Sequence, residues 1–165
     1  MEQSRKSLKD WLILVGLAVL PVALASFVGQ LATTPNLEPW YAGLLKPSFN
    51  LPNWIFAPVW TTLYVLMAIA AWRILRLPRN TPGRQLGLTA FYIQLGMNAA
   101  WSWMFFAAQS PLLGMVNIIP QMLVILATIG LFYRLDKVAG LCLVPLAMWV
   151  SFASLLNLSI LRLNG

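Results

Sequence analysis

The chain contains no histidine and a single cysteine, Cys142, among its 165 residues. The missing histidine excludes His-ligated metal sites, His-ligated haem and a histidine general base. One thiol cannot form an intramolecular disulfide or a thiolate zinc cluster. The sequence therefore predicts no metal site, no required cofactor and no acid–base active site of the usual kind.

Charge is scarce as well. Charged residues make up 9% of the chain and hydrophobic residues 60%, whereas an ordinary soluble domain is about 25% charged. This composition argues against a water-soluble globule, and disorder would need the opposite balance. The net charge is +7, but the cations alternate with apolar segments and form no single basic patch, so we expect no nucleic-acid partner.

The charged residues leave four long segments without any charge, 11–37, 47–72, 85–133 and 138–161. A helix that spans a bilayer needs about 20 mostly apolar residues. Three of the segments hold one such helix each, and 85–133 holds two, with a turn near 109–111. The alternating pattern of a membrane barrel is missing. The predicted fold class is therefore an all-α integral membrane protein, a bundle of five transmembrane helices.

Within one domain, 1–165, the predicted helices cover about 11–32, 53–75, 85–107, 112–133 and 138–161. The connection 33–52 is rich in proline and aromatic residues. Because connections of this length are usually functional or flexible, this loop is a candidate part of the site.

The cations predict the orientation. The first apolar run continues through Leu31, which is long enough to span the membrane rather than be removed as a signal peptide. With five spans, Lys46 and Arg162 lie on one side, and the positive-inside rule places the N-terminus on the opposite, cytoplasmic side. That side holds Arg5, Lys6, Lys9, Arg73, Arg76, Arg79, Arg84, Arg134 and Lys137.

No ionisable residue falls in the middle of a predicted span, which argues against an ion-coupled pump. The spans instead carry aromatic and amide side chains four residues apart, and side chains at this spacing share one helix face. Such faces are expected to turn inward and to line a pocket for a flat, apolar ligand with polar edges. The repeats are Phe56, Trp60 and Tyr64; Gln94, Asn98 and Ser102; and Trp149, Ala153 and Asn157.

Structural roles explain some of these residues equally well. Amides hold membrane helices together, so Asn98 and Asn157 are either interhelix contacts or ligand contacts. Trp11, Trp40 and Trp72 lie near helix ends, where tryptophan is common for interfacial reasons. Trp60 and Trp149 lie several residues inside their spans, where this explanation does not apply.

Three blocks of sequence then carry a resemblance. Segment 40–64, WYAGLLKPSFNLPNWIFAPVWTTLY, closely resembles the signature of the TspO/MBR family, which comprises translocator proteins, tryptophan-rich sensory proteins and the peripheral benzodiazepine receptor. Gln94 and Leu95 with Asn98, Trp101 and Ser102 resemble the family's third-helix motif. The fifth-helix motif is matched by Pro145, Trp149, Phe152, Ala153, Leu156 and Asn157.

The resemblance implies a five-helix bundle, often a homodimer, with a pocket beneath the first long loop. It implies protoporphyrin IX and haem as ligands, along with isoquinoline or benzodiazepine drugs and, in some members, sterols. Trp60 and Trp149 match two pocket tryptophans that bacterial members use in light-dependent porphyrin breakdown, and Ala153 matches a small pocket residue. Other matched pocket positions are Tyr41, Tyr64, Asn98, Trp101 and Ser102.

The chain departs from the family pattern at Phe49, Leu51, Leu146 and Leu158. Phe49 stands where tryptophan is usual and Leu51 where proline is usual. Leu146 and Leu158 each replace a tyrosine, and the second tyrosine belongs to the animal cholesterol motif. A bacterial cell membrane is therefore the expected location.

Three functional hypotheses follow. The first is a receptor or transport-type protein that binds tetrapyrroles for transport, sequestration or stress sensing. The second is an enzyme that degrades porphyrin with light and oxygen, with Trp60 and Trp149 as candidate catalytic residues. The third is a dimeric scaffold joined through Ala25 and Gly29. The candidate ligand-binding residues are Tyr41, Phe56, Trp60, Tyr64, Asn98, Trp101, Ser102, Trp149, Ala153, Leu156 and Asn157.

Overall fold

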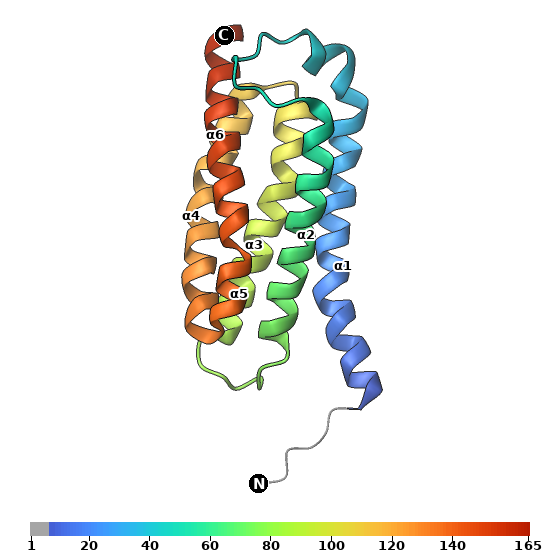
Figure 1. Cartoon of the computed structure of the whole chain (residues 1–165), viewed down its shortest axis with the longest axis vertical. Helices are drawn as coiled ribbons and strands as arrows, with labels where there is room; N and C mark the ends of the chain where they lie inside the picture. Colours follow the sequence, from blue (N-terminus) through green and yellow to red (C-terminus); the bar gives the residue numbers. More distant parts are fainter. Residues whose placement is uncertain (1–6) are drawn as a thin grey trace.

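The computed structural model describes residues 7–165, and within that range all regular structure is helical. Arg5 and Lys6, two of the cations used to predict the orientation, lie outside the described residues. The long helices run alternately up and down one bundle (Figure 1). The α-helices are α1 Leu8–Thr33, α2 Asn53–Leu75, α3 Arg84–Ser102, α4 Pro111–Leu135, α5 Lys137–Cys142 and α6 Val144–Asn164.

Short polar side chains begin three of these helices. The Ser7 hydroxyl accepts a hydrogen bond from the Asp10 amide at 3.2 Å, and the Asp10 carboxylate accepts one from the Ser7 amide at 2.9 Å. Ser110 precedes Pro111 and caps α4, and Asp136 caps α5. Such caps satisfy amides that have no partner within the helix. The turn between α3 and α4 therefore lies at the point that the sequence predicts.

The predicted loop 33–52 is wrong in its first half. Helical turns continue from α1 through Thr34–Asn36. The backbone is extended at Glu38, within Leu37–Tyr41, and a further helical turn follows this kink, so only the segment from Tyr41 to Asn53 is a connection. Two side chains prolong the helix by hydrogen-bonding its carbonyls, Thr33 to Gly29 at 3.0 Å and Asn36 to Ala32 at 2.8 Å. Pro35 does not break the chain because it stands at the start of a new turn, where no amide is needed.

The connection 42–52 crosses the end of the bundle at which the C-terminus lies (Figure 1). It is fixed there by two hydrogen bonds between the backbone of Leu45 and the side chain of Asn164, each 2.9 Å long. The opposite end carries the N-terminal side of α1 and the connection between α2 and α3. The two ends are called here the C-terminal end and the N-terminal end.

Four helices of residues 7–165 are long and apolar enough to cross a membrane: Leu8–Tyr41, Asn53–Leu75, Pro111–Leu135 and Lys137–Asn164. The last combines α5 and α6, which are separated only by Leu143. The helix α3 does not belong to this set, since it carries amide and hydroxyl side chains that lower its hydropathy. The chain is thus an all-helical, multi-pass membrane protein.

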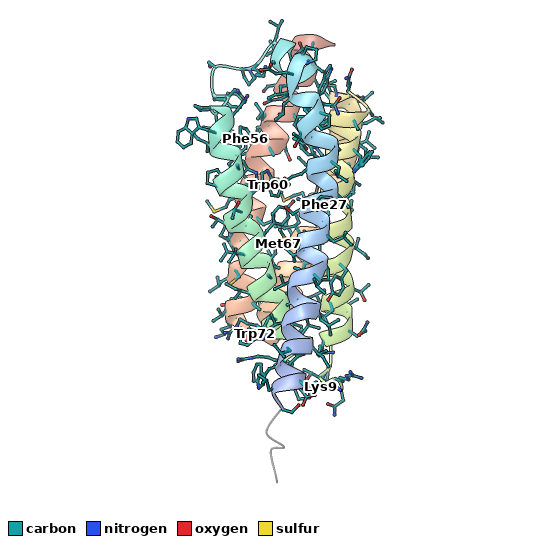
Figure 2. The ribbon with its side chains drawn as sticks, turned by 90° about the vertical axis from the view of Figure 1, so that its right-hand side faces the viewer. Lys9, Phe27, Phe56, Trp60, Met67 and Trp72 are labelled. Carbon is teal, nitrogen blue, oxygen red and sulfur yellow. The ribbon has the colours of Figure 1, made fainter. Side chains whose placement is uncertain are left out.

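The half of the bundle near the N-terminal end has a tightly packed core. Met67, Ala70 and Ile74 of α2 are fully buried, and so are Phe91 of α3 and Phe132 of α4. The rings of Phe91 and Phe132 stack with centroids 5.7 Å apart. Figure 2 shows Met67 and Trp72 on this half of α2, and Phe56 and Trp60 on the other half.

The small residues of α1 do not form an open face for a partner. Ala25 and Gly29 are both buried within the chain, and a Cβ on Gly29 would lie 3.2 Å from Oγ of Ser102. Small side chains allow membrane helices to approach closely, and here they bring α1 onto α3. The prediction that these two residues join a dimer is therefore wrong.

Candidate ligand pocket

A cavity of about 380 Å³ lies inside the bundle, in the half near the C-terminal end. Residues from α1, α2, α3, α4 and α6 line it, together with Tyr41 beneath the connection 42–52. All the predicted ligand-binding residues lie in this lining: Tyr41, Phe56, Trp60, Tyr64, Asn98, Trp101, Ser102, Trp149, Ala153, Leu156 and Asn157. The structure thus brings together side chains that are more than 100 positions apart in the chain.

The wall contributed by α2 is aromatic. Phe56, Trp60 and Tyr64 follow one another at one-turn spacing, and the rings of Trp60 and Tyr64 stack at 5.4 Å with an angle of 30° between them. Offset stacking of this kind fixes the orientation of both rings. The result is a rigid, flat surface on one side of the cavity.

The wall contributed by α6 meets that surface through Trp149. Its ring contacts Phe56 edge to face, with centroids 5.6 Å apart. One turn further along, Ala153 has the smallest side chain of this wall and leaves space between the two aromatic groups. Trp149 also borders an open groove of about 480 Å³ on the outside of the bundle, between α2 and α6. This ring therefore separates the cavity from the outer surface.

Asn157 acts as an interhelix contact. Its Oδ1 accepts a hydrogen bond from Nε1 of Trp101 at 3.3 Å, and its Nδ2 donates to the carbonyl of Pro111 at 2.8 Å. These bonds join α6 to α3 and to the start of α4. A Cβ on Gly114 would lie 2.5 Å from Oδ1 of Asn157, so a glycine is needed where α4 passes this amide. Of the two roles left open for Asn157, the structure supports the packing role.

Asn98 is in a different situation. Its Oδ1 accepts a hydrogen bond from the Tyr64 hydroxyl at 3.1 Å, which joins α3 to α2. Within residues 7–165 its Nδ2 donates no hydrogen bond. The side chain is 6% exposed and lines the cavity. Asn98 therefore has a fixed orientation and one polar end available to a ligand.

Gln94 belongs to the same predicted stripe but does not line the cavity. It lies one turn closer to the N-terminal end, and its Nε2 is 3.7 Å from Sδ of Met67. Its Oε1 is buried and has no hydrogen-bond partner among the described residues. The predicted stripe therefore divides, with Asn98 and Ser102 at the cavity and Gln94 in the packed core.

Sequence reasoning missed the polar wall provided by α1. The side chains of Ser26, Gln30 and Thr33 line the cavity at intervals of three and four residues, and Thr34 follows them. That spacing places polar residues on one face of a membrane helix, which is the pattern that identified the other walls. The long apolar stretch around these residues concealed the pattern.

Gln121 and Ile118 of α4 were missed too, as were Phe105 and Phe106 in the helical turn Trp103–Ala107 that follows α3. The two phenylalanines hold Tyr41 and Trp40 by edge contacts at centroid distances of 5.4 to 6.3 Å. Trp40 thus packs on the bundle beside the cavity. Gln121 follows Asn117 at one-turn spacing on α4, which is the same signal as on the other helices, and the apolar residues around this pair concealed it.

Charged side chains are absent from the described lining of the cavity. Lys46 lies beside Tyr41, a residue of the lining, with its Nζ 4.6 Å from the centre of the Tyr41 ring and within 3.2 Å of the carbonyls of Ala42 and Leu44. The ion pair of Arg73 and Asp136, at 2.8 Å, belongs to the opposite end. The hydrogen bond from Arg73 holds the pKa of the Asp136 carboxyl below its ordinary value.

The profile of the TspO/MBR family matches residues 17–163. The tryptophan-rich protein TspO of Chlorobaculum tepidum is 43% identical over 138 residues, which cover 84% of this chain and 87% of that protein. A tryptophan-rich sensory protein of Cereibacter sphaeroides is 35% identical, over 82% and 85%. The translocator protein of Sus scrofa is 32% identical, over 93% and 91%.

Proposed function

Because the chain belongs to the TspO/MBR family, we propose that it is a membrane receptor or carrier that binds tetrapyrroles in the cavity within its bundle. The resemblance drawn from the three sequence blocks is confirmed at the level of the family. Protoporphyrin IX is the proposed ligand, and haem and other flat apolar molecules are further candidates. Sterols or other lipids belong to the same proposal.

The observation that carries the proposal is the aromatic cavity itself. A ligand that arrives from the bilayer is already in an apolar medium, so little is gained by removing it from water. Affinity must then come from close packing and from ring stacking, which contributes about 0.5–1.5 kcal/mol per aromatic pair. The stacked rings of Trp60 and Tyr64 and the edge contact of Trp149 with Phe56 offer such surfaces.

Metal-free porphyrin is expected to bind at least as well as haem. Haem iron is most often ligated by histidine, cysteine, methionine or tyrosine. The described lining contains none of the first three. Tyr64 already donates its hydroxyl proton to Asn98. A strong six-coordinate haem spectrum of the pure protein would contradict this part of the proposal.

The propionates of a porphyrin would lie at the end of the cavity beside Tyr41. The Nζ of Lys46 is 4.6 Å from the centre of the Tyr41 ring and donates hydrogen bonds to the carbonyls of Ala42 and Leu44. An ammonium group near a carboxylate is favourable where water is partly excluded. The ring would therefore enter with its apolar edge first.

The proposal includes five spans, with α3 as the fifth. Together with the turn Trp103–Ala107 that extends it, α3 runs beside α1 and α4, and its polar face is directed at the cavity, where membrane lipid is excluded. Five spans leave the cations of the N-terminal end on one side, which we propose is the cytoplasm, by the positive-inside rule. A bacterial cell membrane and a homodimer are part of the proposal.

The names of the relatives suggest what role ligand binding has. One is called a sensory protein and another a translocator protein. Binding without charge or acid–base groups in the lining fits sequestration, transport or sensing better than hydrolytic chemistry.

Light-dependent degradation of porphyrin is the second candidate, because Trp60 and Trp149 both border one cavity and are able to donate electrons to an excited ring. Porphyrin bleaching in light and oxygen that is unchanged in Trp60→Phe/Trp149→Phe would exclude it.

The deciding experiment is a titration in the dark of the detergent-purified protein with protoporphyrin IX, followed by tryptophan quenching. Ala153→Phe fills the space between the aromatic walls and is expected to abolish saturable binding. Leu155→Phe is the matched control, because Leu155 is 61% exposed on the outside of α6. Quenching that never saturates, or that is equal in wild type and Ala153→Phe, would mean that porphyrin only enters the micelle.

A further inference from the structure

The groove on the outside of the bundle, between α2 and α6, is separate from the ligand cavity and shares only Trp149 with it. Its volume is about 480 Å³. The backbones of the two helices do not pack closely on each other, since α2 lies mainly against α1 and α5, and α6 mainly against α4. Side chains such as Thr62 of α2 and Met148 and Phe152 of α6 form the walls. The proposed function leaves this groove without a role.

The groove lies at the depth of the hydrocarbon core of the bilayer. Trp149 is near the middle of the membrane-spanning segment Lys137–Asn164, about 18 Å from its start and about 22 Å from its end at 1.5 Å per residue. The hydrocarbon core is about 30 Å thick, so headgroups and water lie well beyond the groove on both sides. Pro58, Thr62 and Met148 are exposed on the outer surface. The groove therefore opens to lipid chains and not to water.

The walls of the groove favour an apolar occupant. The described residues that line it include no charged side chain, and Thr62 is the only one with a hydroxyl. That hydroxyl already donates a hydrogen bond to the carbonyl of Pro58 at 2.9 Å. A polar ligand would lose its hydrogen bonds with water and find few in return. A hydrocarbon chain has no such bonds to lose, and it gains van der Waals contacts with both helices.

Trp149 connects the groove with the ligand cavity. Its ring contacts Phe56 of α2 and Phe152 of α6, with centroid distances of 5.6 and 5.4 Å. Within residues 7–165 its indole N–H makes no hydrogen bond, so apolar contacts alone hold the ring. Because Trp149 borders both spaces, whatever fills the groove packs on the outer side of a ring whose inner side borders the cavity.

We infer that the groove between α2 and α6 is a binding site for one hydrocarbon chain of a bilayer lipid, which packs against the outer side of Trp149. The inference goes beyond the proposed function, because it assigns a second class of ligand to a second site. The bilayer supplies such chains at very high concentration on this side of the protein. The bound chain completes the wall that separates the cavity from the membrane.

The test measures the contact of lipid chains with Trp149 in bilayers of brominated phosphatidylcholine, because bromine quenches tryptophan fluorescence only at short range. The Trp149 component is the difference in quenching between the wild type and Trp149→Phe. Bromine atoms near the bilayer centre are expected to quench this component about twofold more strongly than bromine atoms near the headgroup, as its depth requires.

Two variants fill the groove. Thr62→Phe does so from α2 and is expected to remove the Trp149 component, measured again by subtraction of Trp149→Phe in the same background. Met148→Phe does so from α6, where Met148 is 69% exposed, and replaces Thr62→Phe if that variant does not fold. Val65→Phe is the matched control, since Val65 is 54% exposed on α2 but lies outside the groove. It is expected to keep the Trp149 component.

Native mass spectrometry of the protein released from the same bilayers provides a second measurement. Thr62→Phe is expected to retain one phospholipid fewer per chain than the wild type and Val65→Phe. Quenching of Trp149 that persists in both groove-filling variants, or equal lipid retention by Thr62→Phe and the wild type, overturns the inference. A lipid-free dimer of the wild type that Thr62→Phe abolishes also overturns it, and would assign the groove to a second copy of the chain.

Discussion

The two halves of the bundle use the same helices in opposite ways. Near the N-terminal end, small and medium side chains such as Ala70, Ala71 and Ile74 let the helices close on one another without solvent exposure. Near the C-terminal end, Phe56, Trp60 and Trp149 hold the helices apart and leave a cavity of about 380 Å³. The same long helices therefore close completely over Phe91 and Phe132 in one half and surround a cavity in the other.

This comparison predicts that the packed half determines stability and the open half determines binding. The largest loss of unfolding free energy is expected from Phe132→Ala. Phe132 is fully buried and stacks on Phe91, so its removal leaves a void and is expected to lower the free energy of unfolding by about 3–5 kcal/mol. Unfolding in mixed micelles, followed by circular dichroism, measures the change. A loss below about 1 kcal/mol would contradict the division into two halves.

The next largest loss of stability is expected from replacing either of two glycines by alanine, one glycine in each half of the bundle. A Cβ on Gly140 would lie 2.7 Å from the backbone nitrogen of Tyr133, which cannot move alone, whereas a Cβ on Gly114 meets side-chain atoms of Asn157 and Phe105. Overpacking usually costs about 1–3 kcal/mol. Gly140→Ala is expected near the upper value and Gly114→Ala near the lower one.

The two glycine variants should also differ in binding. Gly114→Ala displaces Asn157, which holds Trp101 at the cavity, and is expected to weaken porphyrin binding as well. Gly140→Ala is expected to leave the affinity of the protein that still folds unchanged. The same melting and titration experiments, carried out side by side, test the pair. Equal effects of both variants on affinity would contradict the comparison.

Trp60→Ala tests the open half directly. One side of the Trp60 ring already faces the cavity and the other stacks on Tyr64, so fewer packing contacts are lost than at Phe132. We expect a loss of about 1–2 kcal/mol in unfolding free energy, together with at least tenfold weaker binding of protoporphyrin IX. If Trp60→Ala is strongly destabilised but still binds protoporphyrin IX normally, the open half determines stability and not binding, which contradicts the comparison.

The smallest effect is expected from the ion pair at the N-terminal end. Because the folded pKa of Asp136 lies below its ordinary value of about 3.9, the pair contributes fully at neutral pH. Its contribution is lost as the pH falls from about 4 through the folded pKa. Asp136→Asn is expected to cost about 1 kcal/mol at pH 7 and to remove this part of the acid sensitivity. Melting temperatures between pH 7 and pH 3 measure it, and ligand affinity is the unchanged control.

Most of the pocket could be predicted from the sequence, for a physical reason. Trp60, Tyr64 and Trp149 lie on turns of helix that the one-turn spacing identifies, and an aromatic or amide face in a membrane span has to turn inward. Asn117 and Gln121 of α4 carry the same signal, since they are four residues apart, and it was missed. The argument fails for Gln94, whose spacing places it on the correct face of α3 but not at the correct depth.

The fold, like the pocket, could be predicted from the sequence only in part. The absence of charge marks the spans because a charged side chain is costly in a bilayer, and this constraint acts on each segment separately. The helical turns that follow α1, up to the kink at Glu38, are supported by Thr33 and Asn36, whose hydrogen bonds to Gly29 and Ala32 are local features that composition does not reveal. The role of Ala25 and Gly29 depends on which helix approaches them, and here it is α3 of the same chain.

The sequence by itself determined the helical membrane character of this protein, its family and the aromatic faces of its helices, because spacing and apolarity act within one segment. Only the tertiary structure decided which of those faces meet, where the cavity ends and which amides remain without a partner. Asn98, Gln121 and Asn157 look alike in the sequence. Among residues 7–165, Asn157 has a hydrogen-bond partner at both ends of its amide, Asn98 at one end and Gln121 at neither. The pairing of polar groups depends on distances between helices, which no single segment encodes.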